Sequence, residues 1–193
     1  MAKNSTYKLG FRRKREGKTN YKKRLDSVKG RLPRLSVRIS NRYVLAQIIE
    51  FNTRGDRTIA AASSRELEKF GWTAAKKNIP SAYLTGMLAA TRAKAKKKEN
   101  AVLDIGFRTP VHGSRCFAVL KGALDAGLKI SFDKSALPKE ERVSGTHIGE
   151  YAKKLSPEDF KKKFSDYAKK NIDAKNLSAM FESAKKKILE EVK

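Results

Sequence analysis

Leu35-Ser-Val-Arg-Ile-Ser40 decides the fold of this chain, because apolar and polar side chains alternate along it without interruption. A period of two is typical of a β-strand that buries one of its faces. The apolar side chains are expected to face a core: Leu35, Val37 and Ile39. The polar side chains, in phase with the arginine before them, are expected to face the other way: Arg34, Ser36, Arg38 and Ser40. The stretch therefore predicts a strand that carries arginines on its open face.

The residues that follow predict two further strands. Residues 43–51 are apolar on both faces, which favours a central strand. The composition of residues 52–56, Asn-Thr-Arg-Gly-Asp, is typical of a turn. Residues 57–63 then return as a third strand, so that a three-stranded meander is expected.

After the meander, the sequence pattern changes to helices alternating with short strands. Ser64 is expected to cap the first of these helices, and Pro80 and Ser81 begin the longest. The expected elements are helices at 65–70, 80–98 and 115–126, and strands at 102–105 and 128–132. A meander followed by this alternation predicts the α/β class, with a mixed five-stranded sheet flanked by helices.

The two ends of the chain differ from this core. Residues 1–18 have no apolar period and are expected to form an extended arm, after which Thr19 caps a short helix that ends at Gly30. Beyond residue 133 a linker leads to helices with narrow apolar stripes, which need another surface to cover them. We predict a basic arm and short helix at 1–32, an α/β core domain at 33–132, and a linker with a C-terminal helical extension at 133–193.

The charge of the chain is concentrated at its N-terminal end. The first 42 residues hold fifteen Lys or Arg against two acids, which is +13 of the formal net charge of +25. So much positive charge destabilises a compact state unless a polyanion neutralises it. Nucleic acid is the leading candidate, since each phosphate contacted by a cation releases a condensed counterion.

Three features favour RNA as that polyanion. In the arm, cations surround Phe11, and aromatic rings such as Phe11 and Tyr7 stack on unpaired bases. On the first strand, arginines offer planar forks that suit phosphates and base edges. A loop at 109–115 leads into a helix, whose first amides favour a phosphate. The chain lacks a helix-turn-helix, a basic zipper and finger spacing, which disfavours the DNA major groove.

The sequence does not support catalysis or a bound cofactor. His112 and His147 lie on loops 35 residues apart without ligand spacing, and the single Cys116 falls inside an amphipathic helix as a small core residue. Asp104 ends a strand, where an aspartate commonly caps a loop or pairs with an arginine. A P-loop, a Rossmann fingerprint and a nucleophile elbow are all absent from the sequence. We therefore predict a protein that is not an enzyme and holds no metal.

Several ordered motifs resemble a known family over residues 1 to about 152. They are Arg-Arg-Lys-Arg-Glu-Gly-Lys-Thr-Asn-Tyr at 12–21, Arg-Leu-Ser-Val-Arg-Ile-Ser-Asn-Arg at 34–42, Ala-Gln-Ile-Ile at 46–49, Gly-Asp at 55–56, Tyr-Leu-Thr-Gly at 83–86 and Val-Leu-Asp-Ile-Gly at 102–106. The chain is similar to the universal large-subunit ribosomal protein family number eighteen in its archaeal form, whose eukaryotic counterparts are called ribosomal protein number five.

The resemblance implies a fold, a function and a set of partners. The fold would be a ribonuclease-H-like core of the translational-machinery type. The protein would bind 5S rRNA and anchor it in the central protuberance of the large ribosomal subunit. Its neighbours would be the 23S-type rRNA and the other 5S-binding ribosomal protein, number five in the bacterial naming. Membranes and small-molecule substrates are not expected partners, and the cytoplasm is the expected compartment.

The residues expected to contact RNA come from the arm, the first strand with its turn, and the loop before the helix at 115. Carried over by position, the strand and turn residues would lie at the 5S interface. The full set is Lys8, Phe11, Arg12, Arg13, Lys14, Arg15, Lys18, Tyr21, Lys22, Arg24, Arg34, Arg38, Asn41, Arg42, Gly113, Ser114 and Arg115.

Two other functions remain as alternatives. A metal-dependent nuclease of the ribonuclease-H-like fold needs clustered acids that begin on the first strand. The sequence has no Asp or Glu between Asp26 and Glu50, which argues against hydrolysis. The second alternative is a protein that binds polyanions without specificity.

Overall fold

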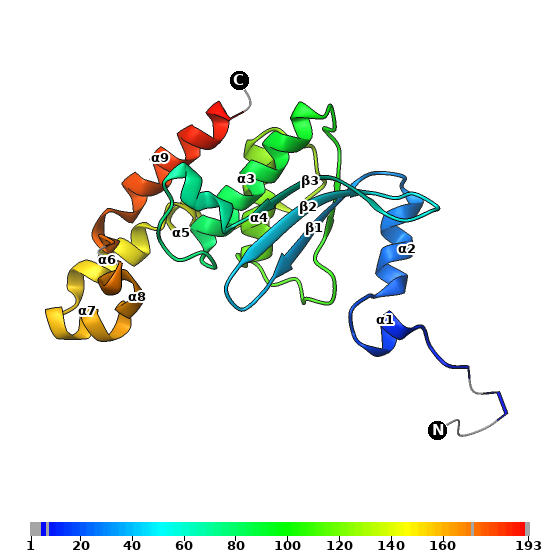
Figure 1. The fold of residues 1–193 in the computed structure, drawn as a ribbon, viewed down its shortest axis with the longest axis horizontal. Helices are drawn as coiled ribbons and strands as arrows, with labels where there is room; N and C mark the ends of the chain where they lie inside the picture. The colour runs from blue at the N-terminus through cyan, green and yellow to red at the C-terminus, as the bar shows by residue number, and fades with distance from the viewer. Residues whose placement is uncertain (1–4, 7, 171, 192–193) are drawn as a thin grey trace.

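A four-stranded sheet occupies the middle of the computed structural model, which describes residues 5–6, 8–170 and 172–191 (Figure 1). The strands are β1 (Arg34–Ile39), β2 (Val44–Glu50), β3 (Arg57–Ser63) and β4 (Val102–Asp104). The helices of the N-terminal part and the core are α1 (Arg12–Arg15), α2 (Tyr21–Lys29), α3 (Ile79–Ala95) and α4 (Arg115–Asp125). The C-terminal helices are α5 (Glu140–Ser144), α6 (Thr146–Lys154), α7 (Pro157–Lys163), α8 (Ser165–Lys169) and α9 (Leu177–Glu190). Short 3₁₀ turns lie at Glu66–Phe70, Lys134–Ala136 and Ala174–Asn176.

The sheet confirms the predicted meander and the mixed topology. Its order is β3-β2-β1-β4, with β1 antiparallel to β2 and parallel to β4. β2 lies between two antiparallel neighbours, as expected for a strand with apolar residues on both faces. Leu35 and Val37 are fully buried in the core, as the alternation along β1 predicts, but Arg34 and Ser36 on the other face are buried as well, at 6% and 4% exposed.

The core lies between one face of this sheet and the α3–α4 helix pair. α3 packs against β2 and β3, and α4 packs along α3. The two helices approach closely because each has a glycine at the crossing. A Cβ at Gly86 would lie 2.0 Å from the Val119 carbonyl oxygen, and one at Gly122 would lie 2.0 Å from the Tyr83 carbonyl oxygen. Only glycine fits at either position, because the opposing atoms belong to the backbone.

The predicted fifth strand is not a strand of the sheet. Leu128 and Ile130 are buried as the pattern required, but their segment pairs only through an isolated parallel bridge between Lys129 and Asn100. Phe132, the last residue of the prediction, is 41% exposed. The segment therefore leaves the sheet edge soon after Ile130. Its buried apolar residues resemble those of a strand in the sequence, although the segment does not pair as one.

Three predicted helix starts are also corrected. The cap of α2 is Asn20 rather than Thr19, because the Asn20 side chain accepts a hydrogen bond from the amide of Lys23. Ser64 does not cap a helix, since its hydroxyl accepts from the amide of Val44 on the neighbouring strand. The long helix begins at Ile79, one residue earlier than expected, after an Asn78 cap. Thr19 and Asn20 have similar capping chemistry, so the sequence alone does not choose between them, and Ser64 has a backbone partner on β2 instead of a helix to cap.

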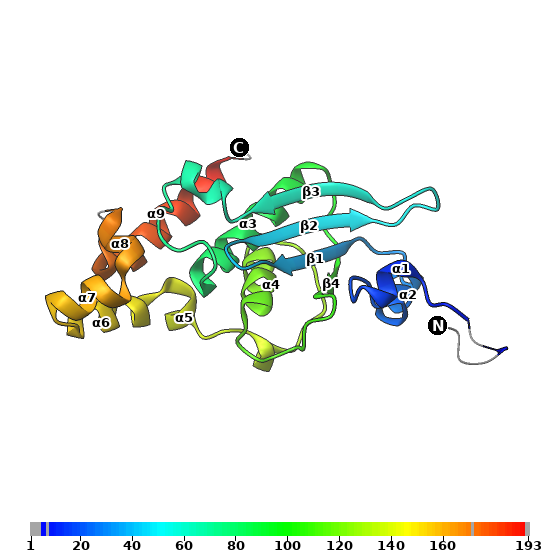
Figure 2. The same ribbon diagram turned by 60° about the horizontal axis from the view of Figure 1, so that its bottom comes forward.

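The C-terminal helices lie at the opposite end of the molecule from the N-terminal arm (Figures 1 and 2). α9 covers α3, with the Phe181 and Tyr83 rings 5.4 Å apart and Arg92 paired with Glu191. The apolar stripe predicted on α9 is buried in the same core as the sheet: Leu177, Phe181, Ala184 and Ile188. One hydrophobic core therefore extends across the predicted boundary at residue 133. Among the described helices, none combines the length and the apolar character needed to cross a bilayer.

Candidate nucleic-acid interface

The basic arm folds back on itself instead of extending. α1 is a single helical turn, and the amides of Lys18 and Thr19 return to the carbonyl of Arg13. Phe11 contacts Tyr21 with ring centroids 5.1 Å apart, and Tyr21 begins α2. The expectation of an extended arm is therefore wrong for residues 11–18, because an aromatic contact and backbone hydrogen bonds close residues 11–19 into a hook. Tyr7 lies outside the described residues.

This hook presents its cations to solvent. The α1 side chains are exposed: Arg12, Arg13, Lys14 and Arg15. The one acid within the hook, Glu16, pairs with Arg12 at 3.5 Å and with Lys18 at 2.7 Å. Two arginines also support the loop, since Nε of Arg13 donates to Thr19 and Nε of Arg15 donates to the Gly10 carbonyl. Exposed pairs of this kind contribute little to stability, so a phosphate can replace them at low cost.

The open face of the sheet holds a network of arginines and aspartates. Arg34 pairs with Asp56 at 2.6 Å and with Asp104 at 3.0 Å. Arg38 reaches the same Asp104 at 3.1 Å, and Arg24 of α2 reaches Asp56 at 2.9 Å. The prediction that Asp104 pairs with an arginine is confirmed, and its other carboxylate oxygen accepts from the amide of Gly106.

Burial separates the roles of these arginines. The side chain of Arg34 is only 7% exposed, whereas that of Arg38 is 45% exposed. A phosphate cannot reach Arg34 unless Asp56 or Asp104 moves. Arg34 therefore holds the two aspartates in place, while Arg38 is available for an ionic contact with a ligand.

The hook and the open face enclose a cleft of about 230 Å³. Six cationic and two acidic side chains line it, which gives a formal net charge of +4. The cations come from the arm, from α2 and from β1: Arg13, Lys18, Lys23, Arg24, Arg34 and Arg38. The structure thus brings together the arm and the strand face, which are separate features in the sequence.

Other predicted residues lie outside this cleft. Lys8, Phe11 and Lys22 are exposed nearby on the arm and α2, but they do not line it. Asn41 and Arg42 lie on the β1–β2 turn, at the opposite end of β1 from Arg34. The sequence places Arg38 and Arg42 four residues apart, yet the end of the strand separates them into different surfaces.

The loop before α4 is less open to a phosphate than the sequence suggests. The amide of Gly113 donates to the Ala136 carbonyl, and that of Ser114 donates to the Val111 carbonyl. Arg115 donates to the Lys77 carbonyl at 3.3 Å, which ties α4 to the loop before α3. Two of the amides expected to face a ligand are therefore engaged within the protein.

Nine residues that line the cleft are missing from the predicted set, among them Lys23, Gln47, Asp56 and Asp104. Gln47 pairs with Ser36 in the register of β1 and β2, so the alternation of both strands together identifies it. Asp56 belongs to a turn whose composition gives no sign that it reaches Arg34. Only the folded chain shows that contact.

The remaining chemical groups show no catalytic arrangement among the described residues. No group of three or more His, Cys, Asp or Glu side chains is placed to hold a metal ion in that part of the chain. Cys116 is 5% exposed, as predicted for a core residue, and burial raises the pKa of its thiol. His147 contacts the Glu141 carbonyl through Nδ1 at 3.2 Å, an ordinary polar contact.

Comparisons with known proteins agree on one family. The family model described as "Ribosomal large subunit proteins 60S L5, and 50S L18" matches residues 5–102 and 93–133. The protein named Large ribosomal subunit protein uL18 from Korarchaeum cryptofilum is 49% identical over 189 residues, which cover 97% of each chain. The protein of the same name from Caldivirga maquilingensis is 48% identical over 98% of this chain and 94% of its own. That from Methanothermobacter thermautotrophicus is 46% identical over the full length of both.

Proposed function

The chain belongs to the family of ribosomal large-subunit proteins 60S L5 and 50S L18, and from that premise we propose that it binds 5S rRNA and anchors it in the central protuberance. The family consists of structural ribosomal proteins and not of enzymes. The chain is accordingly a structural constituent of the large ribosomal subunit.

The observation that carries the proposal is the cleft between the hook and the sheet. The cleft has a net charge of +4, and ion pairs with carboxylates fix the orientation of its arginines. Charged donors that are already fixed lose little conformational entropy when they meet phosphates. Such a surface suits a folded RNA, whose phosphates are themselves fixed in space.

Binding has two parts in this proposal. The exposed cations of α1 supply affinity through counterion release, which depends on salt and not on sequence. The sheet face supplies orientation, because Arg38 and the neighbouring cations of α2 have a fixed spacing. Phe11, which is 70% exposed, adds a ring on which an unpaired base can stack.

The expected surroundings follow from the same proposal. The partners are 5S rRNA, the 23S-type rRNA and the other 5S-binding ribosomal protein, number five in the bacterial naming. The compartment is the cytoplasm, within the large subunit. We also propose the ribonuclease-H-like relationship for the α/β core, and the division into an arm at 1–32, a core at 33–132 and an extension at 133–193.

The test is a competition for labelled 5S rRNA. We expect unlabelled 5S rRNA to displace the probe far better than transfer RNA or duplex DNA does, because the fixed face selects shape. Equal displacement by all three would favour the polyanion binder. Magnesium-dependent cleavage of an RNA–DNA hybrid that disappears in Asp104→Asn would favour the nuclease.

A further inference from the structure

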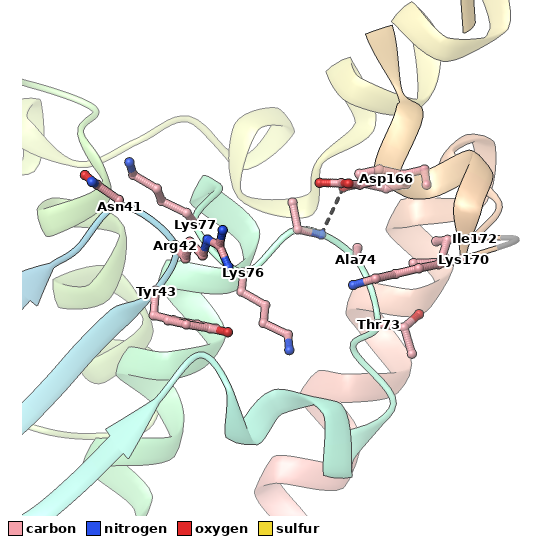
Figure 3. Close-up of a pocket in the computed structure, with 12 residues that line it drawn as sticks. Asn41, Arg42, Tyr43, Thr73, Ala74, Lys76, Lys77, Asp166, Lys170 and Ile172 are labelled. Carbon is pink, nitrogen blue, oxygen red and sulfur yellow. Dashed lines mark hydrogen bonds between the residues drawn. The ribbon is translucent and has the colours of Figure 1, made fainter. Parts of the chain in front are cut away.

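A second cationic pocket lies at the far end of β1 from the cleft (Figure 3). Three segments distant in the sequence form it: the β1–β2 turn at 41–43, the loop at 73–77, and the C-terminal residues around α8. We call it the hairpin pocket. Its volume is about 490 Å³, within the range of sites that hold small ligands. The C-terminal extension therefore helps to build a concave surface on the core.

The charge of the hairpin pocket is strongly positive. Four cations line it against the single carboxylate of Asp166: Arg42, Lys76, Lys77 and Lys170. Figure 3 shows the side chains of Arg42, Lys76 and Lys170 bordering the space between the turn and the C-terminal segment. The lining residues have a formal net charge of +3, of which Glu68 offsets one charge by pairing with Lys76, and the remaining positive charge attracts an anion.

The ring of Tyr43 lies among these cations. The Arg65 guanidinium lies over the Tyr43 ring, 4.7 Å from its centroid, and Nζ of Lys76 lies 5.7 Å from it. A hydrogen bond with Arg65 and its charge, together with Lys76 and Arg42, lower the pKa of Tyr43 from its ordinary value. This lowering agrees with the geometry, which places the Arg65 guanidinium over the ring and Lys76 beside it.

Two of the cations are free to meet a ligand. Lys76 pairs with Glu68, but the exposed Arg42 and Lys170 have no hydrogen bond or ion pair from their side chains to another described residue. Asn41, on the same turn, adds an amide that can donate to a phosphate oxygen.

The loop that carries the lysines is held in place before any ligand arrives. The amide of Ala75 donates to the hydroxyl of Tyr167 at 3.1 Å, and the Ala75 carbonyl accepts from Nε1 of the fully buried Trp72. Thr73 is anchored on the other side by its contact with the sulfur of Met180. Tyr167 and Met180 belong to the C-terminal helices, so the extension fixes the position of this loop. A preformed site of this kind favours a rigid, multiply charged partner.

We propose that the hairpin pocket binds a sugar–phosphate segment of an rRNA strand, as a second RNA contact separate from the cleft. The inference rests on the proposed function and adds a site to it. The cleft is lined by Arg34 and Arg38 of β1, and the hairpin pocket by Asn41 and Arg42 beyond the end of that strand. The two sites share no lining residue, so substitutions in one are expected to act separately from substitutions in the other. A protein with two such sites holds two RNA segments at a fixed separation.

The experiment reverses two charges in the full chain, Arg42→Glu with Lys170→Glu. The matched control reverses two exposed lysines outside both sites, Lys162→Glu with Lys186→Glu. Affinity for a 5S rRNA transcript and for a large-subunit rRNA transcript is measured at several salt concentrations. We expect the pocket variant to bind at least one of them about tenfold or more weakly than the control, with a salt slope smaller by about one to two units.

A third variant reverses the arm charges, so that this inference and the proposed function fail separately. If the pocket variant matches the control while the arm variant loses affinity, the hairpin pocket does not bind RNA and the proposed function stands. If neither variant differs from the control, both fail. If polyglutamate binding depends on the pocket but RNA binding does not, the pocket serves an acidic protein and the inference is overturned.

Tyr167→Phe tests the positioning of the loop without changing any charge. The variant keeps the ring and loses the hydroxyl that accepts from Ala75. We expect an RNA affinity lower by about two- to tenfold, from the loss of one hydrogen bond, with an unchanged salt slope. An unchanged affinity would mean that the C-terminal helices do not organise this site.

Discussion

The α3–α4 helix pair and the N-terminal hook differ in how closely they are packed and in where their charged side chains lie. The helices meet through Gly86 and Gly122, with backbone against backbone. The hook is joined to the body by the Phe11–Tyr21 contact and by ion pairs of α2, and its cations face solvent. We expect stability to depend on the first region and, under the proposed function, RNA affinity to depend on the second, so mutations should separate the two properties.

The largest effect is expected where the helices touch. Gly122→Ala would place a Cβ 2.0 Å from the Tyr83 carbonyl oxygen, and the backbone cannot rotate away from it. We expect the free energy of unfolding to fall by about 3 kcal/mol or more, measured by urea denaturation. Gly30→Ala is the matched control, since its Cβ would meet no atom within 4 Å. A Gly122→Ala protein as stable as this control would contradict the close packing.

The arm should show the reverse behaviour. Changing Arg12, Arg13, Lys14 and Arg15 together to Glu leaves the core untouched, so the urea midpoint should stay near that of the wild type. If the arm contacts about four phosphates, the slope of log affinity against log salt should shrink by about three to four units. An unchanged slope would mean that the arm is not on the RNA.

Asp104→Asn changes both properties, in opposite directions. The carboxylate pairs with Arg34 and Arg38, and Arg34 is nearly buried. Removing the charge should lower the free energy of unfolding by about 2–3 kcal/mol. The cleft would lose one of its two acids, so RNA affinity should rise by about two- to fivefold. Denaturation and filter binding measure the two effects, and a fall in affinity in a folded variant would show that Arg38 needs Asp104 to be positioned.

The smallest effect concerns the hydrogen bond at the edge of the helix pair. The hydroxyl of Tyr83 donates to Asp125 at 2.6 Å, and burial, with this bond, raises the pKa of Tyr83 above its ordinary value. The folded state thus favours the protonated phenol, so its contribution is complete below about pH 10 and is lost as the pH rises further. Tyr83→Phe should lower stability by about 1.5 kcal/mol at pH 7.

The pH dependence provides the control for that last variant. Between pH 9 and 11 the stability of the wild type should fall more steeply than that of Tyr83→Phe, when both are measured by urea denaturation. Parallel curves would mean that the phenol does not titrate differently in the folded and unfolded states.

Secondary-structure elements that depend on the pattern of neighbouring residues could be predicted from the sequence. β1 and β3 were expected within one residue of their bounds, because alternation and turn residues act over a few positions. The strand predicted at 128–132 failed because burial is a property of the folded chain, and a buried segment need not pair with a neighbour.

The residues of the candidate site also fall into those that could be predicted from the sequence and those that could not. The cations of the arm and the exposed Arg38 could be identified from composition and phase. The burial of Arg34 could not, because it depends on Asp56 and Asp104, which are 22 and 70 residues away in the sequence. The same limit applied to Lys170, which is far from Arg42 in the sequence but lines the same pocket in the folded chain.

By itself the sequence determined the α/β class, the meander and the basic arm, and it led to the expectation of a polyanionic partner, since charge density and hydrophobic period act locally. The tertiary structure decided which arginines are free and which are held by aspartates. It also decided that the cationic surface is split between two ends of β1, and that the C-terminal helices complete one of these ends. These outcomes depend on contacts between distant segments, whose geometry is set only when the core packs.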